Sequence, residues 1–207
     1  MDRFCTPYAK RLVIFAKAPQ MGRVKTRLAR GMGMVAATAW YRSACTSLIN
    51  RLAFDTRWST ALVVSPDSAA PGPASWPQIW PRTIARLPQG PGDLGQRMGR
   101  VFQCLPPGPV VLIGSDIPGI NGGHIAQAFA ALGSHDAAIG PSTDGGYWLI
   151  GFKRIKPVGP VFKNVRWSTC HARQDTLNNL SGKTIAFLPT LQDVDEAADL
   201  DGIQTSR

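Results

Sequence analysis

Short apolar runs alternate along the chain with stretches whose apolar residues recur at helical spacing. The runs are rich in β-branched and aromatic residues and are bounded by Pro, Gly or Asp, which is typical of strands buried on both faces. Strands are predicted at 12–16, 59–65, 109–115, 136–142, 147–152 and 184–189. Residues 66–82 are expected to form an irregular connection, with one more strand near Ile79 or Ile84.

The helical pattern fills most of the intervals between these runs. Helices are predicted at 26–53 (broken near Gly31 and Gly33), 93–105, 122–132, 168–180 (capped by Ser168) and 195–200. Strands that alternate with helices favour an α/β fold with a mostly parallel sheet. No internal repeat or linker divides the chain, so we expect one domain over residues 1–207.

The composition is that of an ordinary globular protein, with 44% hydrophobic and 17% charged residues. Its four cysteines, Cys5, Cys45, Cys104 and Cys170, are far apart and form neither a zinc motif nor a disulfide framework. No apolar run approaches the length of a membrane span, and the opening "MDRFCTPYAKR" lacks the apolar core of a signal peptide. We therefore expect a cytoplasmic protein that does not enter the membrane.

A formal charge of +10 favours anionic partners. Most of the Lys and Arg residues are scattered, but Lys17, Arg23, Lys25 and Arg27 crowd the loop after the first predicted strand. This concentration favours a phosphorylated small molecule over nucleic acid, which stays an alternative. The loop contains G-x-x-K-T at 22–26 but not the leading glycine of a P-loop.

Carboxylates follow three other strands of the predicted sheet. Asp116 comes after 109–115, Asp144 after 136–142, and Asp193 and Asp195 after 184–189. Ligands of parallel sheets bind beyond the carboxyl ends of the strands, so the basic loop and these acidic loops are expected to meet. Clustered carboxylates suit Mg²⁺, which shares its oxygen ligands with substrate phosphates. Taken singly, Asp116, Asp193 and Asp195 are also explained as caps of the turn or helix that follows each of them.

Two glycine-rich turns are further candidates. "TDGGYW", 143–148, allows a sharp turn and close backbone approach at Gly145 and Gly146, or it is a plain β-turn. "QGPGDLGQRM", 89–98, places Gly92 and Asp93 at a helix N-terminus. That stretch predicts either an anion or base pocket, with Arg97 as an added cation, or a loop in which Asp93 is only a cap.

The motifs "FAKAPQMGRVKTRLA", "QGPGDLGQRM", "IGSDIPGI", "GPSTDGGYWLIGF", "FKNVRWST" and "DVDEAADL" occur in this order over nearly the whole chain. Together they resemble the DUF2064 family, which is related to nucleotide-diphospho-sugar transferases and includes proteins labelled as arsenosugar-associated glycosyltransferases. More distantly, the chain resembles phospholactate guanylyltransferase and molybdenum cofactor nucleotidyltransferases. The resemblance implies a three-layer α/β/α GT-A fold and a metal-dependent transferase acting on a nucleotide-activated small molecule.

The resemblance also implies roles for particular residues. Lys17, Lys25 and Arg27 would hold the phosphates, and Gly22 would let the backbone approach them. Asp116 matches the metal-binding Asp after the central strand, and Asp193 and Asp195 match a metal-binding pair, for Mg²⁺ or Mn²⁺. Glycosyltransferases usually carry D-x-D at the first position, whereas this chain reads Asp116-Ile117-Pro118.

Several functional alternatives stay open. In a transferase, Lys25, Arg27 and the metal would neutralise charge on the leaving diphosphate. Glycosyl transfer from a nucleotide sugar is expected first, and nucleotidyl transfer from a nucleoside triphosphate second. A non-catalytic nucleotide-binding module is a third possibility. Asp144 is a candidate general base, Tyr147 and Trp148 would be walls of the acceptor site, and Trp167 would either stack on a ring or pack in the core.

Overall fold

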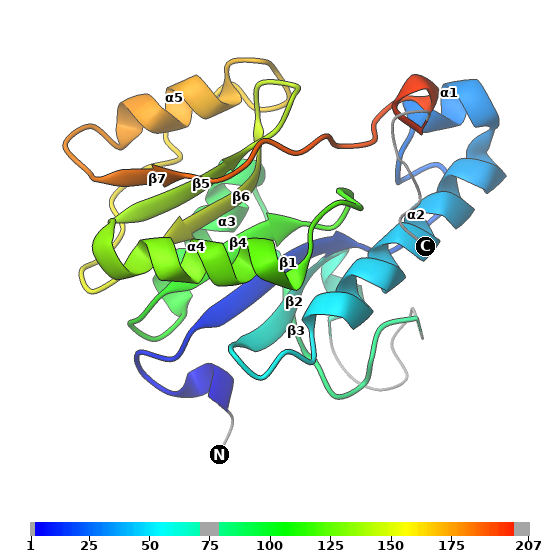
Figure 1. Ribbon diagram of the computed structural model, residues 1–207. Helices are drawn as coiled ribbons and strands as arrows, with labels where there is room; N and C mark the ends of the chain where they lie inside the picture. Colours follow the sequence, from blue (N-terminus) through cyan, green and yellow to red (C-terminus); the bar gives the residue numbers. More distant parts are fainter. Residues whose placement is uncertain (1–2, 71–78, 201–207) are drawn as a thin grey trace.

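One mixed sheet forms the centre of the computed structural model, which describes residues 3–70 and 79–200 (Figure 1). Its strands lie in the order β3-β2-β1-β4-β6-β5-β7, and β6 runs antiparallel to both of its neighbours while the other pairs are parallel. The strands are β1 (Arg11–Lys17), β2 (Ser59–Ser65), β3 (Ala85–Pro88), β4 (Val110–Gly114), β5 (Ala137–Pro141), β6 (Tyr147–Phe152) and β7 (Ile185–Phe187).

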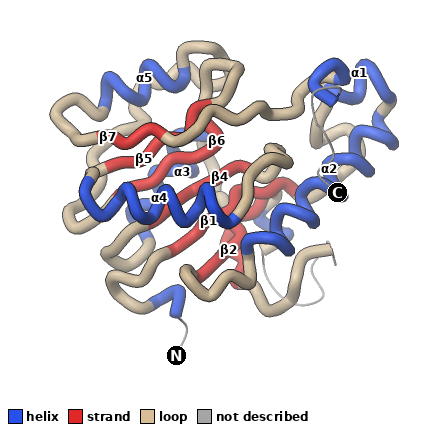
Figure 2. The backbone as a smooth tube through the Cα atoms, viewed as in Figure 1, coloured by secondary structure: helices blue, strands red, loops and turns tan. Residues whose placement is uncertain are grey.

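Helices cover both faces of this sheet, which gives three layers (Figure 2). The α-helices are α1 (Leu28–Met32), α2 (Met34–Leu52), α3 (Leu94–Cys104), α4 (Gly122–Ser134) and α5 (Ala172–Asn179). Short 3-10 turns are η1 (Arg3–Cys5), η2 (Asp67–Ala69) and η3 (Ala197–Leu200). The predicted mostly parallel α/β fold is thereby confirmed. Among the described helices, none is long and apolar enough to cross a membrane.

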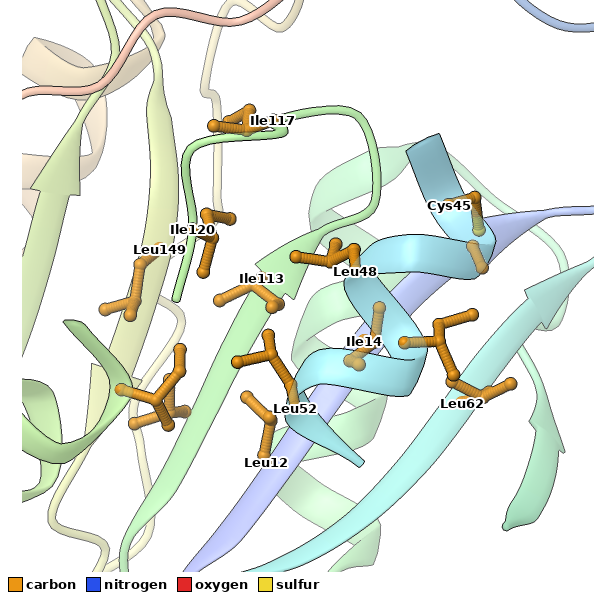
Figure 3. Packing of buried hydrophobic residues seen from close by; sticks show 14 of the residues in the cluster. Leu12, Ile14, Cys45, Leu48, Leu52, Leu62, Ile113, Ile117, Ile120 and Leu149 are labelled. Carbon is orange, nitrogen blue, oxygen red and sulfur yellow. The ribbon is translucent and has the colours of Figure 1, made fainter. Parts of the chain in front are cut away.

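The alternation of side chains along each strand feeds two hydrophobic cores. In β1, Leu12 and Ile14 point toward the layer that holds α2 and α4, whereas Val13 and Phe15 point toward α3 and α5. Figure 3 shows the first core, where Leu48 of α2 packs beside the β1 and β4 side chains. Both faces of the central strands are therefore buried, as their unbroken apolar runs predict.

Most predicted elements are present, with two corrections near the C-terminal end of the chain. The predicted strand near Ile84 is β3, and Gly33 separates α1 from α2. The helix predicted at 168–180 is shorter, because Ser168 has a left-handed backbone (φ 60°) and α5 begins only at Ala172 with His171 as its N-cap. At 195–200 only the 3-10 turn η3 forms. Residues 71–78 of the irregular segment 66–82 lie outside the described residues.

The chain after β7 crosses from one side of the sheet to the other. In Figure 1 this segment runs from β7 to the α1 region, where η3 contacts α1. We call residues 188–200 the C-terminal strap. Its Val194 is fully buried beside Leu28 of α1 and Ala37 of α2, and this anchor fixes the acidic residues on either side of it.

Candidate active site

A pocket of about 820 Å³ lies at the edge of the sheet where β1, β4 and β5 end. Because β6 is antiparallel, its first residue, Tyr147, reaches the same edge. The basic loop and the acidic loops predicted to converge do so here. The predicted site residues that line the pocket are Lys17, Lys25, Arg27, Asp93, Arg97, Asp116, Asp144, Gly146, Tyr147, Trp167, Asp193 and Asp195. Gly22, Gly92 and Gly145 are not among its lining residues.

Lys25 lines the pocket but is paired with two acidic residues and is largely buried. Its Nζ donates to Asp116 Oδ2 at 2.9 Å and to Asp195 Oδ1 at 2.8 Å, and its side chain is only 6% exposed. Burial lowers the pKa of Lys25, but the charge of Asp116 and the bonds to both carboxylates outweigh this and raise it above its usual value. Lys25 is therefore a protonated cation inside the acidic cluster. Arg27 approaches the same Asp195 at 3.5 Å.

The remaining carboxylates lie close enough to Asp193 to perturb its titration. Burial, followed by the charges of Asp144, Asp195 and Asp116, raises the pKa of Asp193 to about 6. Asp144 is oriented by its own loop, because its Oδ1 accepts hydrogen bonds from Ser142 Oγ and, at 2.8 Å, from the Gly146 N–H. This side of the pocket thus holds excess negative charge.

The predicted metal centre of Asp116, Asp193 and Asp195 is not closed into a ligand cluster. Within residues 3–70 and 79–200, no three His, Cys, Asp or Glu side chains are arranged to hold a metal ion. The ammonium group of Lys25 separates two of the predicted ligands instead. The donor set still fits a hard divalent cation, since the carboxylate oxygens of Asp116 and Asp195 already converge on one positive charge.

Tyr41 joins the basic loop to the acidic strand end from beneath the pocket. Its hydroxyl oxygen accepts from the Lys17 N–H at 2.9 Å, lies 3.1 Å from the Lys17 carbonyl oxygen and lies 2.9 Å from Ser115 Oγ. Ser115 directly precedes Asp116. The sequence analysis missed Tyr41, although a phenol on the buried face of α2 is a signal that a polar partner lies in the core.

The turn before α3 combines a cap with the pocket wall. Asp93 is the N-cap of α3 and forms a capping box with Gln96, which confirms the cap interpretation of this residue. Gly92 has a left-handed backbone (φ 100°), and a Cβ there would lie 2.1 Å from Gln96 Oε1. Arg97 donates to the Gly92 carbonyl at 2.7 Å and to the Gln89 side chain at 3.2 Å, so its guanidinium stays beside the pocket.

One wall of the pocket is built from two turns that approach each other closely. Gly145 has φ 87°, and a Cβ there would lie 2.4 Å from the Cys170 carbonyl oxygen. Trp167 packs edge-on against Tyr147, with ring centroids 6.4 Å apart, and also contacts Phe162. Trp167 therefore both lines the pocket and packs in the core, the two roles that the sequence left open. Its neighbours Ser168, Thr169 and Cys170 line the pocket too.

Known structures share this arrangement of elements. A protein from Desulfovibrio desulfuricans G20, provisionally named a nucleotide-diphospho-sugar transferase, is 32% identical with a TM-score of 0.80 over 94% of this chain and 85% of its own. Two others are similar in fold alone. One is 4-diphosphocytidyl-2C-methyl-D-erythritol synthase from Anaerococcus prevotii DSM 20548, with 10% identity and a TM-score of 0.60 over 94% of each chain. The other is glucosyl-3-phosphoglycerate synthase from Mycobacterium tuberculosis, with 12% identity and a TM-score of 0.53 over 94% of this chain and 75% of that one.

The fold is of the GT-A type, and the chain is a transferase with the same arrangement of elements as the D. desulfuricans protein. Residues 48–169 match DUF2064, described as an uncharacterized protein conserved in bacteria. With this match over more than half of its length, the chain belongs to the DUF2064 family. Among curated proteins, none matches the chain.

Proposed function

We propose that this protein is a metal-dependent glycosyltransferase whose donor is a nucleotide-diphospho-sugar. The observation that carries the proposal is the convergence of one basic loop and three acidic loops on a single pocket. The similarity to the D. desulfuricans protein supports the donor class. Further support comes from glucosyl-3-phosphoglycerate synthase, which shares the fold and was crystallised with Mn²⁺ and uridine diphosphate.

The cationic side of the pocket would bind the donor diphosphate. Lys17 and Arg27 are exposed at the end of β1 and in the following loop, and Arg97 approaches from α3. Positive groups fixed at this edge stabilise the negative charge that develops on the leaving diphosphate. Asp116, Asp193 and Asp195 would hold Mg²⁺ or Mn²⁺, which supplies Lewis-acid stabilisation of the same leaving group when bound.

The acceptor would enter on the side of Asp144, Tyr147 and Trp167. The bonds from Ser142 and Gly146 fix one oxygen of Asp144, so the carboxylate is held in one orientation at the pocket surface. This geometry suits a general base that removes the proton of an acceptor hydroxyl. The aromatic pair of Tyr147 and Trp167 offers an apolar face of the kind that packs against a sugar ring.

Nucleotidyl transfer from a nucleoside triphosphate is the second candidate. Asp116-Ile117-Pro118 lacks the second Asp of the D-x-D motif, and the basic loop has enough cations for a triphosphate. The products separate the two reactions. Glycosyl transfer releases a free nucleoside diphosphate from a nucleotide sugar, whereas nucleotidyl transfer releases pyrophosphate.

The test is a panel of nucleotide sugars and nucleoside triphosphates, each with Mg²⁺ or Mn²⁺, in which both products are measured. We expect nucleoside diphosphate release that Asp116→Asn abolishes. Lys25→Ala should weaken donor binding by about 10- to 150-fold, the value of a charged hydrogen bond. Lys156→Ala, an exposed lysine that does not line the pocket, is the matched control. Donor binding without either product would instead indicate a non-catalytic nucleotide-binding module.

A further inference from the structure

A cation of the protein itself already contacts the acidic side of the pocket. Lys25 Nζ lies within 2.9 Å of one oxygen of Asp116 and one oxygen of Asp195. These residues are two of the three carboxylates that the proposed function assigns to the divalent cation. A metal ion held by these carboxylates would therefore compete with the ammonium group for the same oxygens.

The surroundings of Lys25 show that this contact is built into the fold. The backbone of Lys25 is left-handed (φ 46°), a conformation that non-glycine residues rarely adopt and that clusters at functional sites. Its side chain is 6% exposed, whereas those of Asp116 and Asp195 are each 39% exposed. The lysine thus reaches the carboxylates from the wall of the pocket and leaves their other side open.

We propose that Lys25 is a placeholder for the divalent cation: it neutralises Asp116 and Asp195 in the metal-free protein, and metal binding displaces it. The displaced ammonium group would then turn toward the donor phosphates, a step that rests on the proposed function. Lys25 would in this way couple the loading of the metal to the completion of the phosphate site.

Displacement follows from the geometry and charge of the two cations. Magnesium requires oxygen ligands at about 2.0–2.1 Å in octahedral geometry, so it would draw Asp116 and Asp195 closer than the lysine does. A divalent ion bound there would also repel an ammonium group that stays between the same oxygens. Asp193 and Asp144 add negative charge on the pocket side, which attracts a second positive charge to the cluster.

The first test compares Mn²⁺ affinity, measured by isothermal titration calorimetry without nucleotide, in the wild type and in Lys25→Met. We expect the variant to bind Mn²⁺ about tenfold more tightly, because the metal no longer has to break two partly exposed ion pairs. Lys25→Arg keeps a cation in place, so its Mn²⁺ affinity should stay near that of the wild type. Lys17→Met removes one charge from the same pocket without touching the carboxylates, so it measures the general electrostatic effect.

A second measurement uses the unmodified protein and does not depend on a variant that folds. Acetic anhydride labelling, read residue by residue by mass spectrometry, should modify Lys25 slowly in the metal-free protein and faster with saturating Mn²⁺. The labelling rate of Lys156, which is exposed and does not line the pocket, should not change on adding Mn²⁺.

The outcomes separate this inference from the proposed function. Tighter binding by Lys25→Met together with faster labelling of Lys25 would support the placeholder. The placeholder would be overturned if Lys25→Met bound Mn²⁺ no more tightly than Lys17→Met does. It would also be overturned if Mn²⁺ did not speed the labelling of Lys25. Either result would leave the metal site itself standing. Absence of Mn²⁺ binding in every variant would overturn both the placeholder and the metal dependence.

Discussion

The hydroxyl group of Tyr41 is predicted to hold the two halves of the pocket together, and Tyr41→Phe removes it without changing the shape of the side chain. Tyr41 is only 4% exposed, and its oxygen is within hydrogen-bond distance of Lys17 N, Lys17 O and Ser115 Oγ. The change would therefore leave the Lys17 N–H and the Ser115 hydroxyl without this partner.

The size of the effect follows from the cost of unpaired polar groups. A buried donor or acceptor left without its partner costs about 1–3 kcal/mol, and we expect about 2 kcal/mol here because part of the group lies near the pocket. In a protein of this length, about 1 kcal/mol lowers the Tm by about 2–4 °C. Tyr41→Phe should thus lower the Tm by about 4–8 °C.

Urea denaturation and thermal unfolding measure this loss directly. Tyr8→Phe is the matched control, because Tyr8 is 69% exposed and the same atom is removed from a solvated ring. The control should stay within about 0.5 kcal/mol of the wild type. A Tyr41→Phe variant as stable as Tyr8→Phe would show that the three contacts contribute nothing to the fold.

Two further predictions concern the opposite wall and the buried thiol. Gly145→Ala should destabilise the protein by more than about 1 kcal/mol, because the added Cβ would meet the Cys170 carbonyl. Gly133→Ala in α4 is the control: its added Cβ meets no atom within 4 Å, so it should not destabilise the protein. Equal stability of the two variants in urea denaturation would refute the reasoning. In the native protein, Ellman's reagent should react with the three exposed cysteines but not with Cys45, which is buried and whose pKa burial raises to about 11. Rapid reaction of all four thiols would contradict this prediction.

The fold could be predicted because its signals are local. The run at 12–16 is apolar on both faces and rich in β-forming residues, which predicts a fully buried strand, and this strand is β1. The helix predicted at 168–180 was harder, because Ser168 has a left-handed backbone and the adjoining Cys170 packs closely against Gly145, a residue 25 positions earlier in the chain. A helical pattern in sequence cannot report such a tertiary constraint.

The position of the site was predictable for a similar reason, but its internal pairing was not. The carboxyl ends of parallel strands lie at one edge of a sheet, and this rule predicted that the basic loop lies near Asp116. The partners of Lys25 lie 91 and 170 residues away along the chain, so no spacing in the sequence indicates that its ammonium group bridges two carboxylates. The order of strands and loops in the sequence thus predicted which loops meet, whereas the ion pairs of Lys25 could be identified only from the three-dimensional structure.

The acidic pair at the end of the chain shows how a local pattern can carry more than a cap. Asp193 and Asp195 line the pocket, while Val194 between them is fully buried against α1 and α2. The helix-cap alternative fails for both residues, because it is Asp199 that accepts the Asp195 and Glu196 N–H groups. In Asp193-Val194-Asp195, the apolar side chain of Val194 therefore anchors the C-terminal strap, and the two flanking carboxylates face the pocket. The geometry of the candidate metal site thus depends on how well this strap packs.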